Sequence, residues 1–473
     1  MRRWLAVVAL AVGVGLAACE ASDDSEPGAK QPPERISASE LEPCGKVPEP
    51  EGFRCGSIEV PFERSDPSYG KTEIAFALRT RDRRDRPPLG TIFAQEGGPG
   101  YASTGTANAY TKLFGGLLER YDLVLVDMRG TGFSDPIECP DLQKGLGPEW
   151  IALPECARRL GKRFISYRTS AGADDLNDVR RALGLRKIIL YGDSYGTFFG
   201  QSYGFRHGDT LSALVLDSAY PTRGESAWYP SLIETGNVAL ELACKRSPEC
   251  PPGAARRLEK LVDYLRETGR TVEPLLGAFA GATYGTPDSY LEIDEAGSKL
   301  VDGNAKPWNE LVAEAIKPTS GDPLEYVRAA EMAVSCNDYP LIWDRDSPQR
   351  ERHRQLERAI RNHDPDTFAP FTPREVGLSV NFGYQYCLTW PRPTEVYEPP
   401  ISPGQEPTRA PVLVVSGEMD NLTTPDEGRM VADEFPNSEL FIARNAGHVN
   451  ALYYRDQEAA SEVRRFIRRN TPE

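Results

Sequence analysis

Strand-like apolar runs alternate with stretches of helical periodicity along most of the chain. Ile74, Phe76 and Leu78 alternate with polar or small neighbours in "KTEIAFALRTR", which predicts a half-buried antiparallel strand. Several of the later runs are continuously apolar, which is typical of parallel strands buried on both faces. These later runs are "GTIFAQ", "YDLVLVDMRG", "KIILYG", "LSALVLDS", "PVLVVSG" and "ELFIARN".

Helix-compatible stretches lie between most of these runs. In "ADDLNDVRRALG", Leu176, Val179 and Leu183 recur at helical spacing, acidic residues occupy the first turn, and Gly184 is placed to end the helix. The alternation of strand and helix predicts an α/β fold in which helices cover both faces of one sheet.

One interval is too long to be a connecting loop. About 190 residues separate "LSALVLDSAY" from "PVLVVSG", whereas loops without secondary structure of their own rarely exceed about 15 residues. Pieces such as "PPGAARRLEKLVDYLRETG" are helix-like. We therefore expect a mainly helical cap over 221–409, inserted between a first core part over 41–220 and a second core part over 410–473.

The N-terminus has the features of an export signal. Arg2 and Arg3 precede "LAVVALAVGVG", an apolar stretch too short for a settled transmembrane helix. "LAAC" follows and resembles a bacterial lipobox, in which Cys19 would become lipidated. We expect a lipoprotein signal peptide over 1–18 and a flexible polar tether over 19–40. An ordinary signal peptide cleaved after the small residues is the alternative.

These features predict an exported protein, either held at the outer face of the bacterial cytoplasmic membrane by the lipid on Cys19 alone or secreted. The formal net charge is −15, whereas a nucleic-acid-binding protein needs a basic surface. We expect no nucleic-acid partner and a monomer that this charge keeps in solution.

The chain has nine cysteines, and eight remain for disulfides if Cys19 carries lipid. The sequence alone does not choose among the possible pairings. Proximity along the chain favours Cys44–Cys55, Cys139–Cys156 and Cys244–Cys250, which leaves Cys336–Cys387 as the long pair. No cysteine or histidine cluster has the spacing of a zinc site, so we expect no metal and no other cofactor.

The strongest chemical signal is the G-x-S-x-G pattern from Gly192 to Gly196, centred on Ser194. In this motif the serine sits on a tight strand-to-helix turn that projects its hydroxyl above the sheet, and the small flanking residues avoid a clash. The strand-like "KIILYG" precedes the motif and a helix-compatible segment follows it. The context indicates a nucleophilic serine rather than a serine in an ordinary turn.

A serine nucleophile needs a base and an acid that orients the base, in the chain order serine, acid, histidine. His448 follows the last strand-like run, so we assign it as the general base. The acid should follow the penultimate strand, where Asp420 is preferred over Glu418 because it lies further into the loop. The other histidines lie at the end of the nucleophile's helix or in charged cap sequence: His207, His353 and His363.

The tetrahedral intermediate needs backbone N–H donors. One is expected from Tyr195, directly after the nucleophile. The second is expected in "FAQEGGPGYAS", whose glycines let the backbone approach a ligand closely. Because this stretch follows a strand-like run, we assign Gly98 as the second donor rather than interpreting the stretch as a simple turn.

The order of five segments resembles the proline iminopeptidase/tripeptidyl aminopeptidase family of serine α/β-hydrolases: "GGPG", "VDMRGTGFSDP", "GDSYGT", "GEMDNLTTP" and "AGHVN". The cap pieces "AVSCNDYP" and "YCLTWP" resemble its secreted tripeptidyl aminopeptidase branch. The resemblance covers nearly all of the chain after the leader. It implies an α/β-hydrolase fold with a mostly parallel eight-stranded sheet and a large helical cap. Arg129, in the specific "DMRGTGFS" motif, either braces the loops around the site or forms a structural ion pair.

An aminopeptidase must bind a free α-ammonium group. A carboxylate about 4 Å away, in an effective dielectric near 20, attracts it by about 4 kcal/mol before desolvation. Asp338, beside Cys336, is the leading candidate for this carboxylate. Glu96, which stands where proline iminopeptidases often carry histidine, and Glu225 are alternatives. A solvated surface acid is the competing interpretation for each of them.

The resulting prediction is an exported serine aminopeptidase that cleaves peptide substrates near a free N-terminus, releasing tripeptides through an acyl-enzyme. Two other functions stay open: an esterase or lipase, which predicts an apolar cap lining and no acid near the site, and a non-catalytic cell-surface binding lipoprotein. An epoxide hydrolase or dehalogenase would need an aspartate in place of Ser194.

Overall fold

The structure is a computed structural model, and it describes residues 35–37, 39–45, 52–146, 148–223, 230–315, 321–453 and 457–471. The expected signal peptide, Cys19, most of the expected tether and Glu225 lie outside the described residues. The described residues belong to one unit, Pro33–Glu473. None of the described helices is both long enough and apolar enough to cross a membrane.

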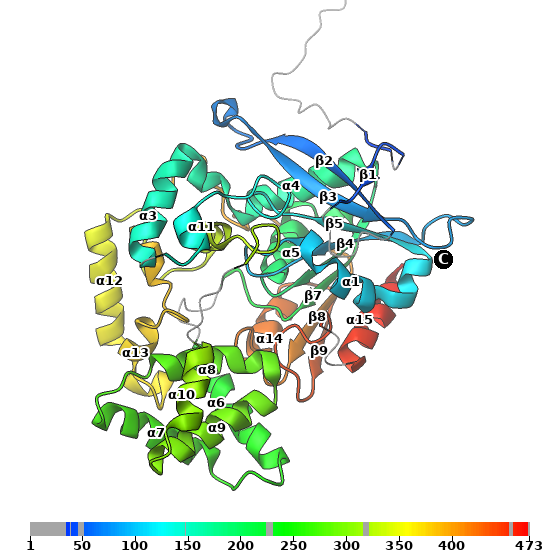
Figure 1. Ribbon diagram of the computed structural model, residues 1–473. Coiled ribbons are helices and arrows are strands. Elements are labelled where there is room, and N and C mark those ends of the chain that lie inside the picture. Colours follow the sequence, from blue (N-terminus) through cyan, green and yellow to red (C-terminus); the bar gives the residue numbers. More distant parts are fainter. Residues whose placement is uncertain are drawn as a thin grey trace, which may run out of the picture. The chain divides into compact units, whose positions relative to one another are not determined.

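A sheet of nine strands forms the centre of the described chain, in the order β1-β2-β3-β5-β4-β6-β7-β8-β9 (Figure 1). Pairing is antiparallel from β1 through β2 and β3 to β5, and parallel for all other neighbours. The strands are β1 (Glu42–Pro43), β2 (Phe53–Pro61), β3 (Lys71–Arg79), β4 (Gly90–Gln95), β5 (Tyr121–Val126), β6 (Ile188–Asp193), β7 (Leu211–Asp217), β8 (Val412–Gly417) and β9 (Ser438–Ala443).

The predicted mostly parallel α/β sheet is confirmed, with one strand more than the expected eight. The extra strand is β1, whose two residues pair with β2 beside the Cys44–Cys55 disulfide. Two residues are too few to form an apolar pattern, so the sequence carried no periodicity signal for this strand.

Alternate residues of the buried strands serve two apolar cores, one on each face of the sheet. Val412 and Val414 of β8 join the core under helices α4, α5 and α14, whereas Leu413 and Val415 join the core under α1 and α15. The helices outside the segment between β7 and β8 are α1 (Ala107–Phe114), α2 (Pro140–Gln143), α3 (Glu149–Leu160), α4 (Thr169–Ala182), α5 (Tyr195–Arg206), α14 (Pro425–Asp433) and α15 (Gln457–Asn470).

The segment between β7 and β8 is mainly helical, as predicted for the cap, although its exact boundaries stay a prediction. Helices α6 to α10 lie together as a group (green in Figure 1). Their apolar core also contains Met419, from the loop after β8, so cap and sheet meet at that loop. The helices are α6 (Pro230–Arg246), α7 (Ala254–Glu267), α8 (Glu273–Ala282), α9 (Asp288–Val301), α10 (Lys306–Ala315), α11 (Arg328–Asp338), α12 (Gln349–Asn362) and α13 (Pro373–Gly377).

Four disulfides join parts of the described chain. Cys139–Cys156 joins the start of α2 to α3, and Cys336–Cys387 joins α11 to the short 3-10 helix η8 (Gln385–Thr389). The other two are Cys44–Cys55 and Cys244–Cys250. Disulfides persist in oxidising compartments, so these four indicate an extracytoplasmic location.

Candidate active site

Ser194 lies at the bend between β6 and α5. Its φ of +51° is in the left-handed region, which a residue with a side chain adopts only under local constraint. Only glycine fits at the positions two residues before and two residues after Ser194. A first side-chain carbon would lie 2.0 Å from the Gly196 carbonyl oxygen if placed on Gly192, and 2.1 Å from the Gln95 carbonyl oxygen if placed on Gly196. The strand, turn and helix predicted around this serine are therefore present.

Ser194, His448 and Asp420 form a continuous hydrogen-bonded chain. Ser194 Oγ lies 2.8 Å from His448 Nε2, and His448 Nδ1 lies 2.9 Å from Asp420 Oδ2. The three side chains follow β6, β9 and β8, at the carboxyl ends of parallel strands. With the imidazole proton on Nδ1 facing the carboxylate, Nε2 is left to accept the serine proton. This is the arrangement of a serine hydrolase triad.

The Asp420 carboxylate is fully buried and held by several donors. Its Oδ2 also accepts from the Thr423 hydroxyl at 2.7 Å, and its Oδ1 accepts from the Leu422 and Thr423 amides at 3.0 Å each. Burial opposes ionisation, but His448 and these hydrogen bonds outweigh it and lower the pKa of Asp420. The group is thus kept ionised and fixed in orientation toward the imidazole.

Glu418, the other acid considered for this role, is bound elsewhere. Its carboxylate pairs with Arg246 at 2.7 Å and accepts from the Asn445 amide at 3.0 Å. The hydrogen bond from Arg246 is the main reason that the pKa of Glu418 is lowered. His207 lies 2.8 Å from Asp174, at the far end of α5. The remaining two histidines lie on α12 or directly after it: His353 and His363.

The two expected oxyanion donors lie next to Ser194. Tyr195 follows it directly, and Gly98 lines both cavities that open at Ser194. Gly97 allows this approach, because a first side-chain carbon there would lie 2.7 Å from Ser194 Cβ. No hydrogen bond among the described residues uses the Gly98 or Tyr195 amide. Both N–H groups are therefore available to an oxyanion.

One of the two cavities is acidic. It has a volume of about 270 Å³ and opens at Ser194 and His448. Arg328 is the one cation among its described lining residues, and it already binds Glu331 at 2.8 Å. Carboxyl groups therefore outnumber cations, which favours a positively charged ligand group. The lining carboxyl groups are Glu96, Asp193 and Glu331.

Glu96 and Asp193 are both buried and share one hydroxyl donor. The Tyr110 hydroxyl lies 2.8 Å from Asp193 Oδ1 and 3.2 Å from Glu96 Oε2. The Gly97 amide donates to Glu96 Oε1 at 3.2 Å. Burial, and next the charge of Glu96, raise the pKa of Asp193 well above its ordinary range. Burial and the neighbouring Glu96 carboxyl group therefore favour the protonated form of Asp193.

The second cavity is aromatic and smaller, at about 150 Å³. It shares Gly98, Ser194, Tyr284 and His448 with the acidic cavity. A larger depression of about 590 Å³ surrounds Thr408, but none of the triad residues lines it. In the smaller cavity, an apolar side chain or ring beside the scissile bond would find aromatic partners. The aromatic lining residues include Tyr220, Tyr339, Phe382 and Tyr384.

Asp338 was expected to bind a substrate amine, but it lines neither cavity. Its carboxylate accepts from the amide and the hydroxyl of Thr169, at 2.5 and 2.6 Å. Thr169 is the first residue of α4, where exposed amides and the helix dipole favour a carboxylate. The sequence placed Asp338 in the cap but did not show which face of its helix meets the active site.

Glu331, like Asp193, is a lining carboxyl group of the acidic cavity that the sequence did not predict. It lies on α11 about two turns before Asp338, and its only sequence signal is its place on the same cap helix. Glu96 lines the acidic cavity, where a partner of the substrate ammonium group would have to lie. Glu225, the third acid considered, lies outside the described residues.

Arg129 is fully buried and forms a structural ion pair. Its guanidinium donates to Asp175 through two nitrogens, at 2.7 and 2.8 Å, and to the carbonyls of Phe62 and Ser166, at 2.7 and 3.1 Å. It thereby joins the loop after β5 to α4 and to the end of β2. Arg129 therefore has both of the roles that the sequence left open, because it forms a structural ion pair and also holds a loop in place.

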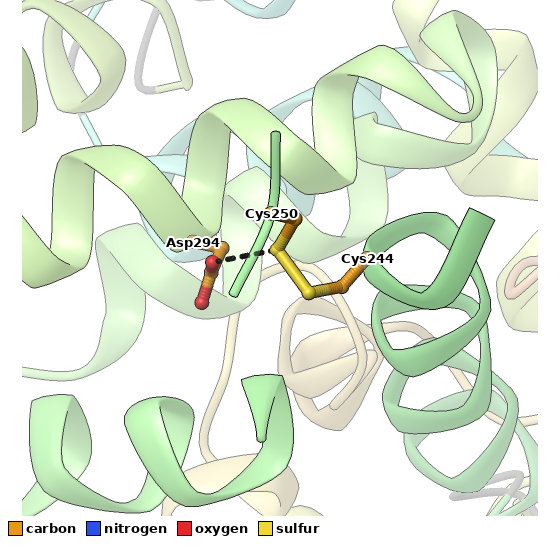
Figure 2. A group of neighbouring side chains, drawn as sticks. All are labelled: Cys244, Cys250 and Asp294. Atoms are coloured by element: carbon orange, nitrogen blue, oxygen red, sulfur yellow. Dashed lines mark hydrogen bonds between the residues drawn. A yellow bond between two sulfur atoms is a disulfide. The ribbon is translucent and has the colours of Figure 1, made fainter. Parts of the chain in front are cut away.

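Figure 2 shows the one group of three potential metal ligands found among the described residues: Cys244, Cys250 and Asp294. The two sulfurs are bonded to each other, and Arg257 donates to the Asp294 carboxylate at 2.7 Å. Metal ions bind thiolates rather than disulfide sulfurs, and this carboxylate already has a cation. The chemistry of the group therefore fits a structural role, in which the disulfide joins α6 to the loop after it and the ion pair joins α7 to α9.

Two family models match the chain. The alpha/beta hydrolase fold model matches residues 91–235, and the TAP-like protein model matches residues 374–473. The first range contains Gly98, Ser194 and Tyr195, and the second contains Asp420 and His448. All five residues of the expected triad and oxyanion hole thus lie inside matched ranges.

Similar curated proteins include the tripeptidyl aminopeptidase of Streptomyces coelicolor, which is 27% identical over 448 residues, covering 84% of this chain and 77% of that protein. The serine protease Hip1 of Mycobacterium tuberculosis is 26% identical over 463 residues, covering 88% and 85%. Among solved structures, a proline iminopeptidase of Mycobacterium smegmatis is similar with a TM-score of 0.41 and 15% identity, covering 88% of this chain and 99% of that one.

Proposed function

We propose that this chain, an α/β-hydrolase with a TAP-like C-terminal region, is an exported serine aminopeptidase. It hydrolyses peptide bonds close to a free N-terminus and releases tripeptides. The observation that carries the proposal is the acidic cavity at Ser194, where Glu96 and Glu331 outnumber the single cation Arg328 among the described lining residues. The relatives named tripeptidyl aminopeptidase support the same activity.

The triad geometry supports an acyl-enzyme mechanism. His448 Nε2 accepts the proton of the Ser194 hydroxyl, whose oxygen attacks the peptide carbonyl carbon. The negative charge of Asp420 stabilises the imidazolium, and the Gly98 and Tyr195 amides donate to the oxyanion. His448 then gives its proton to the leaving amine as the C–N bond breaks. Water, deprotonated by His448, hydrolyses the ester and restores Ser194.

Glu96 is the proposed partner of the substrate ammonium. It lines the acidic cavity at Ser194, and none of the ion pairs among the described residues involves it. A carboxylate about 4 Å from an ammonium group gains about 4 kcal/mol in an effective dielectric of 20, part of which desolvation offsets. Glu331 contributes less, because it is already ion-paired with Arg328 at 2.8 Å.

The number of residues released depends on the distance between the ammonium partner and Ser194. An extended peptide advances by about 3.4 Å per residue, so a fixed partner selects one product length. Tripeptide release is the length supported by the names of the two Streptomyces relatives.

Export by a lipoprotein signal with a lipid anchor at Cys19 is part of the proposal. The four disulfides support the extracytoplasmic location. Expression of wild type and C19A in a bacterial host tests the anchor. Wild type should partition with the membrane, and C19A should be released to the soluble exported fraction. Equal release of both would contradict the anchor.

The activity is tested with peptide anilides of one to four residues that carry a free N-terminus, together with a short-chain ester. We expect the highest kcat/KM for the tripeptide, and no turnover by S194A. Better cleavage of the ester than of every peptide would favour the esterase alternative. Failure of a fluorophosphonate probe to label Ser194 would favour a non-catalytic binding protein.

A further inference from the structure

A short segment of the cap contacts both the acid and the base of the triad. Thr283 and Tyr284 belong to the 3-10 helix η6 (Thr283–Gly285). The Thr283 hydroxyl donates to Asp420 Oδ1 at 3.3 Å, and the Thr283 carbonyl accepts from the backbone amide of His448 at 3.2 Å. The Tyr284 ring lies edge-on to the His448 imidazole, with 5.5 Å between ring centroids. One turn of the cap thus touches two of the three triad residues.

The backbone packing at this contact is close. A first side-chain carbon on Gly447, the residue before His448, would lie 1.9 Å from the Thr283 carbonyl oxygen. Only glycine lets the loop that carries His448 approach the cap this closely. Thr283 is fully buried, so its hydroxyl has no access to bulk water. The hydrogen bond to Asp420 is therefore the interaction that satisfies this donor.

The loop that carries Asp420 is attached to the cap on both sides of that residue. The Tyr290 hydroxyl on α9 donates to the Met419 carbonyl at 3.1 Å, and the Asn421 side chain donates to the Phe279 carbonyl on α8 at 3.0 Å. The Met419 side chain is fully buried in the apolar core of the cap. The position of the catalytic acid therefore depends on the cap as well as on the sheet.

We propose that Thr283 is a positioning residue for the triad, through which the cap fixes the Asp420 carboxylate and the His448 loop relative to Ser194. The inference rests on the triad of the proposed function, but not on a peptide being the substrate. Among the described residues, Oδ1 of Asp420 has three donors, and only Thr283 supplies one from outside the acid's own loop.

Loss of the Thr283 hydroxyl should affect the transition state more than substrate binding. The carboxylate would be less firmly held against His448 Nδ1, and the imidazolium that forms during attack on the substrate would be less stabilised. Complete loss of a hydrogen bond to a charged group lowers a rate that depends on it by about 10-fold or more. Because the bond is 3.3 Å long, we expect about a 5- to 10-fold effect.

The test compares T283V, which replaces the hydroxyl by a methyl group of similar size, with T283S, which keeps the hydroxyl. T268V is the matched control, because the Thr268 hydroxyl bonds only carbonyls of its own helix end on α7. The measurements are kcat and KM on a tripeptide anilide, the second-order rate of Ser194 labelling by a fluorophosphonate probe, and Tm. For T283V we expect kcat and the labelling rate to fall about 5- to 10-fold, with KM within about 2-fold of wild type. T283S and T268V should stay within about 2-fold of wild type in both rates.

A T283V variant with wild-type kcat and labelling rate would overturn the inference. Equal loss in T283V and T283S, with lowered Tm in both, would also overturn it, because packing rather than the hydroxyl would then be responsible. If wild type reacts with the probe but cleaves no peptide with a free N-terminus, the proposed function fails, and the labelling rates alone decide the role of Thr283. A wild-type protein that the probe does not label would overturn both.

Discussion

Glu96 and Glu331 line one cavity at Ser194, although Glu96 follows strand β4 of the sheet and Glu331 lies on helix α11 of the cap. Arg328 forms an ion pair with Glu331 at 2.8 Å and a second one with Glu149 at 2.5 Å. Glu96 instead has no ion pair among the described residues and accepts from the Tyr110 hydroxyl and the Gly97 amide. The two carboxylates therefore offer different amounts of negative charge to a substrate ammonium.

The E96Q substitution should raise KM for substrates with a free N-terminus by about 10- to 100-fold, because it removes the charge of a buried ammonium partner. Steady-state kinetics on a tripeptide anilide measure the change. The effect of E331Q should be smaller, since Arg328 already compensates that charge. E310Q, at an exposed position of α10, is the matched control and should leave KM unchanged. A larger rise in KM for E331Q than for E96Q would show that Glu331, not Glu96, binds the ammonium group.

The D420N substitution should lower kcat by about 10⁴-fold while leaving Tm within a few degrees of wild type, because the imidazole loses its orienting anion. E418Q is the matched control two positions away. Its carboxylate binds Arg246 rather than the imidazole, so its kcat should stay close to that of wild type. Comparable losses in the two variants would refute the choice of Asp420 as the acid.

Ionisation of Asp217 should lower the free energy of unfolding as pH rises. It is fully buried, and among the described residues its side-chain carboxylate accepts from the Tyr191 hydroxyl and the Leu452 amide. Burial raises its pKa from 3.8 to about 6. Between these values the folded protein binds more protons than the unfolded one, so the free energy of unfolding falls with rising pH across this window. Above about pH 6 the charged form costs roughly 2–3 kcal/mol.

The D217N substitution removes this titration. Its free energy of unfolding relative to wild type should improve by about 2 kcal/mol between pH 4.5 and pH 7.5, as measured by urea denaturation at both pH values. The exposed Asp302→Asn substitution is the control and should show no such difference. A D217N effect that is the same at both pH values would contradict the raised pKa.

The Cys336–Cys387 disulfide should stabilise the fold more than Cys244–Cys250. The two bridges close loops with sequence separations of 51 and 6 residues. In the chain-entropy account these correspond to about 4 and about 2 kcal/mol. Urea denaturation of C336A/C387A and C244A/C250A measures the difference. A larger loss in the free energy of unfolding for C244A/C250A than for C336A/C387A would contradict the chain-entropy account.

The parts of the site that the sequence predicted are those fixed by local sterics or by chain order. Gly192 and Gly196 are required by contacts within one strand-turn-helix unit, so their spacing carried the signal for Ser194. Asp420 and His448 followed from their places after successive strand-like runs. Each of these inferences needs only the order of elements in an α/β sheet, which apolar periodicity shows well.

The parts that the sequence did not predict depend on how the cap packs against the sheet. Asp338 and Glu331 share one helix, and only the packing of α11 decides that Glu331 lines the cavity while Asp338 binds the start of α4. Thr283 is distant from Asp420 in the chain and shows no motif. Helical periodicity identifies the buried face of a cap helix but not the partner that covers it.

The most direct test of the central claim compares one tripeptide anilide with a free N-terminus and with an acetylated N-terminus, in wild type and in E96Q. The account predicts that acetylation lowers kcat/KM of wild type by at least about 10-fold, because the cavity loses its cationic ligand group. In E96Q, acetylation should have a much smaller effect. Equal kcat/KM for the two substrates in wild type would contradict an aminopeptidase.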